Sequence, residues 1–128
     1  MKPEVIKLLE KAADCLESAA FNLENGFLDA AVNRSYYAIF DAVTALLLLK
    51  DITVKSHSGA IQQFSLHFIK TNLFEKELQE SLIFCFQKRQ TGDYDLYSDI
   101  NREDAELCFS RAKEFVSVAE NWIFGKNK

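Results

Sequence analysis

A stripe of polar residues interrupts one of the most apolar stretches of the chain. At positions i, i+3, i+7 and i+10 of this stretch stand Arg34, Tyr37, Asp41 and Thr44. A helix would place them on one face. Because a buried arginine or aspartate without a partner is strongly destabilising, we expect the stripe to face polar partners or a solvated cleft. Arg34 and Asp41 are about two helical turns apart, too far to pair with each other.

Two further polar interruptions carry groups that could bind a phosphate and move protons. The segment KSHSG contains His57, and the segment KRQTGDYDLY, which follows the apolar SLIFCF, contains Arg89, Asp93 and Tyr94. Arginine offers a forked, permanent cation to phosphate oxygens, and histidine titrates near neutral pH. We expect these side chains to meet the stripe in a single cleft.

A purely structural interpretation of the same residues remains open. Arg34 and Arg89 could hold Asp41 and Asp93 in ion pairs that serve the fold alone. An arginine in the last turn of a helix also complements the exposed carbonyl groups there, and Gly92 would then be the stop of that helix.

The aromatic residues near these positions have structural interpretations too. Tyr36 is expected to pack with its ring against the core and its hydroxyl in water. For His57, an ordinary loop histidine close to the start of a helix is a more common role than a catalytic base. Neither residue type alone therefore predicts catalysis.

Composition limits the class of protein. The formal net charge of −4 argues against a broad basic surface, so no DNA binding is expected, although a local anion site stays open. The start of the chain lacks a signal-peptide pattern, and the longest apolar run, Ala42 to Leu49, is too short to cross a membrane. We expect a cytoplasmic protein.

The sequence lacks the usual signs of a metal or cofactor site. The three cysteines, Cys15, Cys85 and Cys108, stand singly in apolar stretches and have no zinc-like spacing. They are expected to be buried thiols. Phosphate-binding loops, nucleophile elbows and zinc-protease motifs are absent. No metal and no cofactor are therefore expected.

Hydrophobic periodicity predicts an all-α fold over a single domain, residues 1–128. Proline occurs once and glycine four times, too few for the tight turns of a β-sandwich. The predicted helices are Pro3–Asn25, Leu28–Lys50, Gly59–Lys70, one from the Asn72 region to Arg89, and one from Asn101 almost to the end. The second is apolar all round and should be central. An antiparallel up-and-down bundle of four to five helices follows.

Capping residues support these boundaries. Ser56 or Ser58 could cap the third helix, and Asn72 with Glu75 resembles a capping box for the fourth. Asn101 resembles the cap of the last helix.

Three segments, taken in order, resemble the HEPN family of small prokaryotic helical proteins. They are AAVNRSYYAIFDAVTALLLLK, KSHSGAIQQFSLHFIKTNLF and FQKRQTGDYD, and the resemblance extends from about Leu8 to Ala119. It implies a helical bundle, a homodimer and a partner that is a small nucleotidyltransferase, the two forming a toxin–antitoxin pair. Many members of the family are metal-independent ribonucleases.

In those ribonucleases an arginine is followed four to six residues later by a histidine at the dimer interface, and RNA is cleaved by attack of its 2′-hydroxyl. Arg89 matches the arginine, and Asp93 falls among the polar positions between the two. The histidine is missing, since Tyr94 stands five residues after Arg89 and Asp95 six. A tyrosine with its ordinary pKa near 10 is a poor base at pH 7. His57 could replace the missing group.

The resemblance and the polar residues together predict binding of a nucleotide or an RNA phosphate. The alternatives are a ribonuclease toxin and a non-catalytic structural dimer. The residues expected in catalytic positions are Arg89, Asp93 and Tyr94. Those expected to bind substrate are Arg34, Tyr37, Asp41 and His57.

Overall fold

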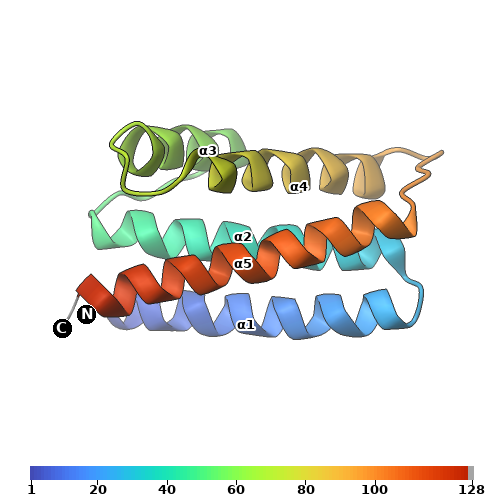
Figure 1. The fold of residues 1–128 in the computed structure, drawn as a ribbon, viewed down its shortest axis with the longest axis horizontal. Helices are drawn as coiled ribbons and strands as arrows, with labels where there is room; N and C mark the ends of the chain where they lie inside the picture. The colour runs from blue at the N-terminus through green and yellow to red at the C-terminus, as the bar shows by residue number, and fades with distance from the viewer. Residues whose placement is uncertain (127–128) are drawn as a thin grey trace.

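The computed structural model describes residues 1–126, which form helices and no strand. The helices are α1 (Pro3–Glu24), α2 (Leu28–Leu49), α3 (His57–Phe64), the π-helical turn η1 (Ser65–Ile69), α4 (Lys76–Tyr94) and α5 (Arg102–Lys126). Helices α1, α2, α4 and α5 run alternately up and down, and α3 with η1 lies at one end of the bundle (Figure 1). The predicted all-α, up-and-down bundle is confirmed.

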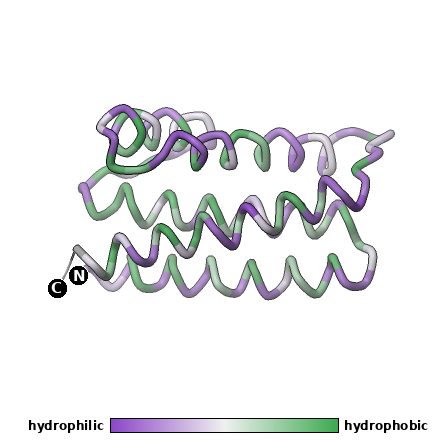
Figure 2. Tube along the Cα trace, viewed as in Figure 1, coloured by the Kyte–Doolittle hydropathy of each residue, from purple (hydrophilic) through white to green (hydrophobic). Residues whose placement is uncertain are grey.

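Helix α2 is the central element, as its apolar character predicts. It packs against α1, α3, α4 and α5, and Figure 2 shows it as hydrophobic over most of its length, whereas α1 and α5 alternate hydrophobic and hydrophilic positions. A helix that is apolar on all sides is stable only when neighbours cover it. Polar side chains beyond the first turn of α2 are therefore held among packed helices, whereas Asp29 in that turn is exposed.

Two of the predicted caps are confirmed. The Ser56 hydroxyl accepts a hydrogen bond from the backbone N–H of Gly59 at 2.9 Å, and the side-chain oxygen of Asn101 accepts one from the N–H of Asp104 at 2.8 Å. Since Ser56 is the cap, α3 begins at His57. The histidine is thus fixed in the first turn of a helix.

The capping box predicted at Asn72 is wrong. Asn72 adopts a left-handed conformation with φ of 61°, and α4 begins only at Lys76, without a side-chain cap. The predicted third helix also changes form, because after Phe64 it continues as the π-helical turn. An asparagine tolerates the left-handed region well, which competes with its use as a cap.

Gly92 does not stop α4, contrary to prediction; the helix continues to Tyr94. A β-carbon at Gly92 would lie 2.8 Å from Cδ1 of Ile100 and 3.4 Å from the carboxyl group of Asp29. The glycine therefore permits close packing of the 95–101 connection and α2 against α4. Arg89 consequently lies inside a helix and not at its last carbonyl groups.

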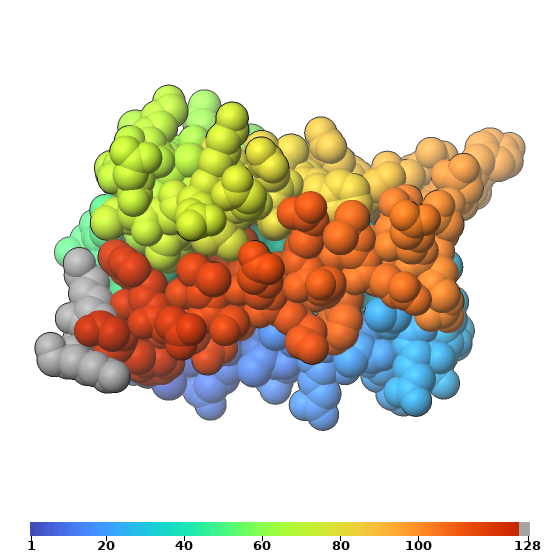
Figure 3. Space-filling view, viewed as in Figure 1, coloured from blue at the N-terminus to red at the C-terminus, as the bar shows by residue number. Residues whose placement is uncertain are grey.

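The connection from α4 to α5 projects beyond the end of the bundle (Figure 3). Leu96 and Tyr97 on it are 86% and 85% exposed. Elsewhere the three cysteines are buried free thiols, as predicted. None of the helices described is long and apolar enough to cross a membrane.

Candidate functional site

Arg89 is the centre of a polar cluster between α2 and α4. Arg89 is only 7% exposed. Nε donates a hydrogen bond to Asp93 Oδ2 at 3.0 Å, and Nη2 donates to the hydroxyl groups of Tyr37 at 2.8 Å and Tyr94 at 3.2 Å. Within residues 1–126, no hydrogen-bond acceptor is found for Nη1. The guanidinium is held rigidly, with one arm of its fork still able to bind an anion.

Tyr37 lies between the two arginines that the sequence singled out. The Cζ atom of Arg34 lies 5.2 Å from the centre of the Tyr37 ring, and that of Arg89 lies 5.3 Å from it. Both distances are in the range of cation–π attraction. The two guanidinium groups thus converge on one side chain from separate helices.

Arg34 has only neutral partners among the described residues. Its Nε and Nη2 donate to the side-chain oxygen of Asn33 at 2.9 and 2.7 Å, and Nη1 contacts the sulfur of Cys15 at 3.7 Å. Arg89, in contrast, forms an ion pair with Asp93. Asp93 thus balances Arg89, whereas Arg34 is coupled electrostatically to the buried Asp41, which contacts the same Cys15 sulfur.

Asn33 connects the two arginines and was missed by the sequence analysis. Its amide nitrogen donates to Asp93 Oδ2 at 2.8 Å, the same oxygen that accepts from Arg89. The structural interpretation therefore holds for one pair: Arg89 and Asp93 form an ion pair, whereas the described ion pairs do not join Arg34 to Asp41. The only signal in the sequence that could have pointed to Asn33 was its position next to Arg34.

His57 reaches the cluster through Tyr36. The Tyr36 hydroxyl lies 2.8 Å from Nδ1 of His57, and Tyr36 is fully buried. The prediction that this hydroxyl lies in water is therefore wrong. A tyrosine inside a helix that is apolar all round is expected to be buried with a hydrogen-bond partner, and that signal was available.

Both groups of this pair are neutral near pH 7. Burial raises the pKa of Tyr36 well above its usual range, although the nearby Arg89 opposes this. Burial, and then the positive charge of Arg89, lowers the pKa of His57 below its ordinary 6.5. Desolvation disfavours the charged form of either group.

An open hollow of about 530 Å³ lies between the start of α3 and the end of α4. Its lining residues are Ser56, His57, Ser58, Phe86, Arg89, Gln90 and Tyr94. Arg89 and His57 thus face one concavity, as predicted, with serine hydroxyls and an exposed tyrosine ring at its rim.

Asp41 lies outside the Arg89 cluster, contrary to the prediction of a shared cleft. It is buried against α1, where Oδ2 lies 3.9 Å from the sulfur of Cys15. Burial raises the pKa of Asp41, while Lys11 and Arg34 oppose the rise. Asp41 and Arg34 both contact Cys15 on α1, whereas Tyr37 accepts a hydrogen bond from Arg89 on α4.

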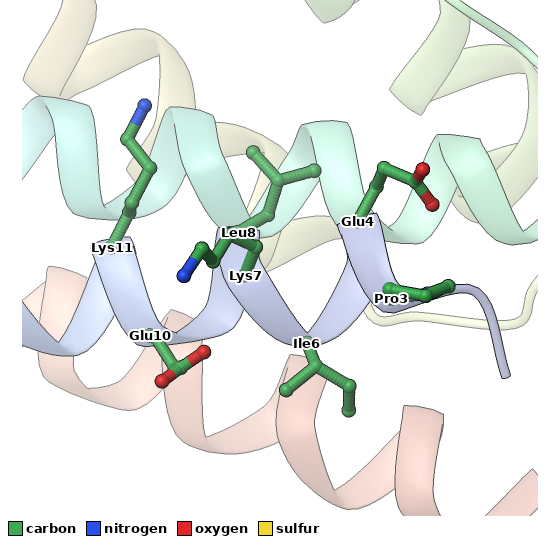
Figure 4. Close-up of a pocket in the computed structure, with 7 residues that line it drawn as sticks. All are labelled: Pro3, Glu4, Ile6, Lys7, Leu8, Glu10 and Lys11. Atoms are coloured by element: carbon green, nitrogen blue, oxygen red, sulfur yellow. The ribbon is translucent and has the colours of Figure 1, made fainter.

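A larger hollow of about 760 Å³ lies along α1 and offers no comparable chemistry. All its lining residues belong to this one helix. In Figure 4 their side chains diverge, with Lys11 and Glu4 pointing one way and Glu10 and Ile6 the other.

Residues 1–126 contain no group of three His, Cys, Asp or Glu side chains that could hold a metal ion.

A model of the HEPN domain matches residues 5–122. The chain belongs to the HEPN domain family. The resemblance inferred from its three segments is thereby confirmed. In this HEPN domain, the cluster around Arg89 joins the second and third of those segments, because Phe86 and Arg89 face His57 across the hollow.

Curated relatives of this HEPN domain cover nearly its whole length. A protein of Methanocaldococcus jannaschii named "Putative toxin MJ0142" is 40% identical over 126 residues, which is 98% of this chain and 86% of that protein. A "UPF0332 protein" of Thermotoga maritima is 37% identical over 113 residues, 88% of this chain and 86% of the other. A second M. jannaschii protein, "Putative toxin MJ0605", is 33% identical over 116 residues, 91% of this chain and 86% of that protein.

Proposed function

We propose that this HEPN domain binds the phosphate group of a nucleotide or of RNA in the hollow beside Arg89. The observation that carries the proposal is the state of Arg89: a buried guanidinium, fixed by Asp93, Tyr37 and Tyr94, whose Nη1 has no acceptor among the described residues. Preorganised arginine forks bind phosphate oxygens because the ordering of the side chain precedes binding.

Charge supports an anionic ligand. Arg34 lies on the other side of the Tyr37 contact and has no carboxylate partner among the described ion pairs. Asp93 compensates only one of the two arginines. A phosphate that enters the open hollow would therefore meet the guanidinium of Arg89 directly, and Arg34 would attract it only at longer range.

Titration of the purified protein with a fluorescent nucleotide, and separately with a labelled single-stranded RNA, tests this function. We expect saturable binding to at least one probe, with displacement by excess unlabelled probe and weakening at high salt. Absence of saturable binding to both probes would contradict the proposal.

A second candidate is a ribonuclease toxin, and the names of two relatives as toxins favour it. In this case Arg89 would hold the scissile phosphate, and Asp93, Tyr94 or His57 would transfer protons. Incubation of labelled RNA with the wild type and with Arg89→Ala separates the two candidates. Binding alone predicts no cleavage products from either protein, whereas the toxin predicts products from the wild type only.

We further propose that the domain forms a homodimer and acts with a nucleotidyltransferase as a toxin–antitoxin pair. Support comes from the toxin names of its relatives and from the exposed apolar residues Leu96 and Tyr97 next to the site. If the cluster only specifies the dimer, Arg34→Met or Arg89→Met will change the mass measured by light scattering without altering nucleotide affinity.

A further inference from the structure

The hydrogen bond between Tyr36 and His57 can be formed in two ways that differ in the position of a proton. The hydroxyl oxygen and Nδ1 are 2.8 Å apart. Either the hydroxyl donates to an unprotonated Nδ1, which leaves the proton of the neutral ring on Nε2, or Nδ1–H donates to the hydroxyl and Nε2 is unprotonated. In the first arrangement His57 offers a donor to the hollow, and in the second it offers an acceptor.

The surroundings of Tyr36 distinguish the two arrangements. Tyr36 is fully buried, and residues 1–126 supply its hydroxyl with no hydrogen-bond partner other than His57. If the hydroxyl accepted from Nδ1–H, its own proton would be buried without an acceptor, which costs about 1–3 kcal/mol. If the hydroxyl donates, this cost disappears.

The outward nitrogen has no such constraint. His57 is half-buried and lines the hollow, and Nε2 has no partner among the described residues. A ligand or water can satisfy an N–H at that position. The cationic neighbour Arg89 also disfavours a doubly protonated ring, so the neutral tautomer is the relevant form near pH 7.

We infer that Tyr36 is a positioning residue: its hydroxyl donates to Nδ1 and holds the neutral His57 as the Nε2–H tautomer, so that His57 gives a phosphate a second N–H donor beside Arg89. The site would then take a phosphate monoester or diester anion between one cationic and one neutral donor. The ligand half of this inference rests on the proposed function, whereas the tautomer does not.

This tautomer has a consequence for catalysis. A general base for attack by a 2′-hydroxyl must accept a proton, and Nε2 cannot accept one while it carries its own. His57 is thereby unsuited to replace the histidine missing after Arg89. A ribonuclease at this site would therefore depend on Asp93 or Tyr94 for proton transfer.

Nitrogen-15 NMR of the histidine rings at pH 7.5 tests the tautomer without any ligand. The chain has two histidines, and His67 is an internal reference because no described hydrogen bond involves its ring. For His57 we expect Nδ1 in the unprotonated range and Nε2 in the protonated range. In Tyr36→Phe both nitrogens should move towards the averaged values of a free tautomer mixture. A protonated Nδ1 in the wild type would overturn the inference.

A phosphate titration tests the role of the donor. Followed by the same His57 resonances, inorganic phosphate should bind Tyr36→Phe about threefold to tenfold more weakly than wild type, the effect of one lost hydrogen bond. Phenylalanine keeps the buried ring, and Tyr97→Phe, at an 85% exposed position, is the matched control. Equal affinity in Tyr36→Phe would contradict the positioning role. A wild type that binds no phosphate, with Nδ1 unprotonated, would contradict the proposed function instead.

Discussion

Arg34 and Arg89 approach the same aromatic ring, that of Tyr37, to within 5.2 and 5.3 Å. They come from α2 and α4, 55 positions apart in the chain, and only one of them is paired with a carboxylate in the described structure. Arg89 lines the hollow and Arg34 does not, so an anion bound there would meet Arg89 directly and Arg34 only at longer range.

Tyr37→Phe should destabilise the fold by about 1–2 kcal/mol, because Nη2 of the buried Arg89 loses its closest acceptor at 2.8 Å. Urea unfolding followed by circular dichroism measures the change. Tyr97→Phe removes a hydroxyl with no described partner and is expected to leave the unfolding midpoint unchanged. Identical midpoints for the two variants would show that the Tyr37 hydroxyl does not anchor Arg89.

Asp41→Asn should increase the free energy of unfolding at pH 7 by about 1 kcal/mol, since a buried carboxylate with only a thiol partner is replaced by a neutral group of the same shape. The raised pKa of Asp41 gives the sign: above its folded pKa the ionised carboxylate costs stability, and this cost is absent below the unfolded value near 4. The gain should therefore vanish in urea unfolding at about pH 4.

The same variant separates Asp41 from the proposed binding site. Because Asp41 faces α1 and Cys15, its substitution should leave phosphate affinity unchanged. Asp14→Asn, an exposed position on α1, is the control for stability and should have little effect. A loss of phosphate binding in Asp41→Asn would show that Asp41 belongs to the phosphate site.

His57 should make the fold less stable in mild acid. Its pKa is lowered in the folded state by burial and by Arg89, so between that value and about 6.5 the unfolded chain binds more protons. The free energy of unfolding should therefore be full above pH 6.5 and decrease as the pH falls through this window. The measurement is urea unfolding from pH 5 to 8.

His57→Gln is the matched variant for this pH series. Glutamine keeps an N–H donor near the position of Nε2 but does not titrate, so the decrease between pH 6.5 and 5 should become smaller. An unchanged decrease would assign it to other groups. The variant should also retain most of the phosphate affinity, because the proposal assigns His57 a donor role and no proton transfer.

The fold could be predicted from the sequence because its signal is local. The apolar period of the first helix, the all-round apolarity of the second and the caps at Ser56 and Asn101 each act over a few residues, and the structure confirms them. Asn72 and Gly92 were misjudged because each residue type has two common uses. Asn72 adopts a turn with positive φ and does not cap α4. Gly92 allows a close contact between elements and does not end α4.

The site could be predicted only in part, because it depends on contacts between segments distant in sequence. Arg89 and Asp93 are four residues apart in one helix, so their spacing alone brings these side chains together. Tyr94 is five residues after Arg89, and helical spacing does not predict its contact. The contacts of Tyr36 with His57 and of Asn33 with Asp93 depend on how α2 is rotated against α3 and α4. The same rotation directs Asp41 to α1, which no pattern in one helix reveals.

Equilibrium titration of labelled RNA and nucleotide against Arg89→Gln tests the central claim most directly. Glutamine keeps a polar side chain but removes the charge and the fork, while Arg102→Gln removes an arginine from the exposed start of α5 and leaves the hollow intact. With both variants shown to be folded by circular dichroism, we expect affinity to fall at least tenfold in Arg89→Gln and to change less than twofold in Arg102→Gln. Equal affinity in the two variants would contradict the assignment of the phosphate site to Arg89.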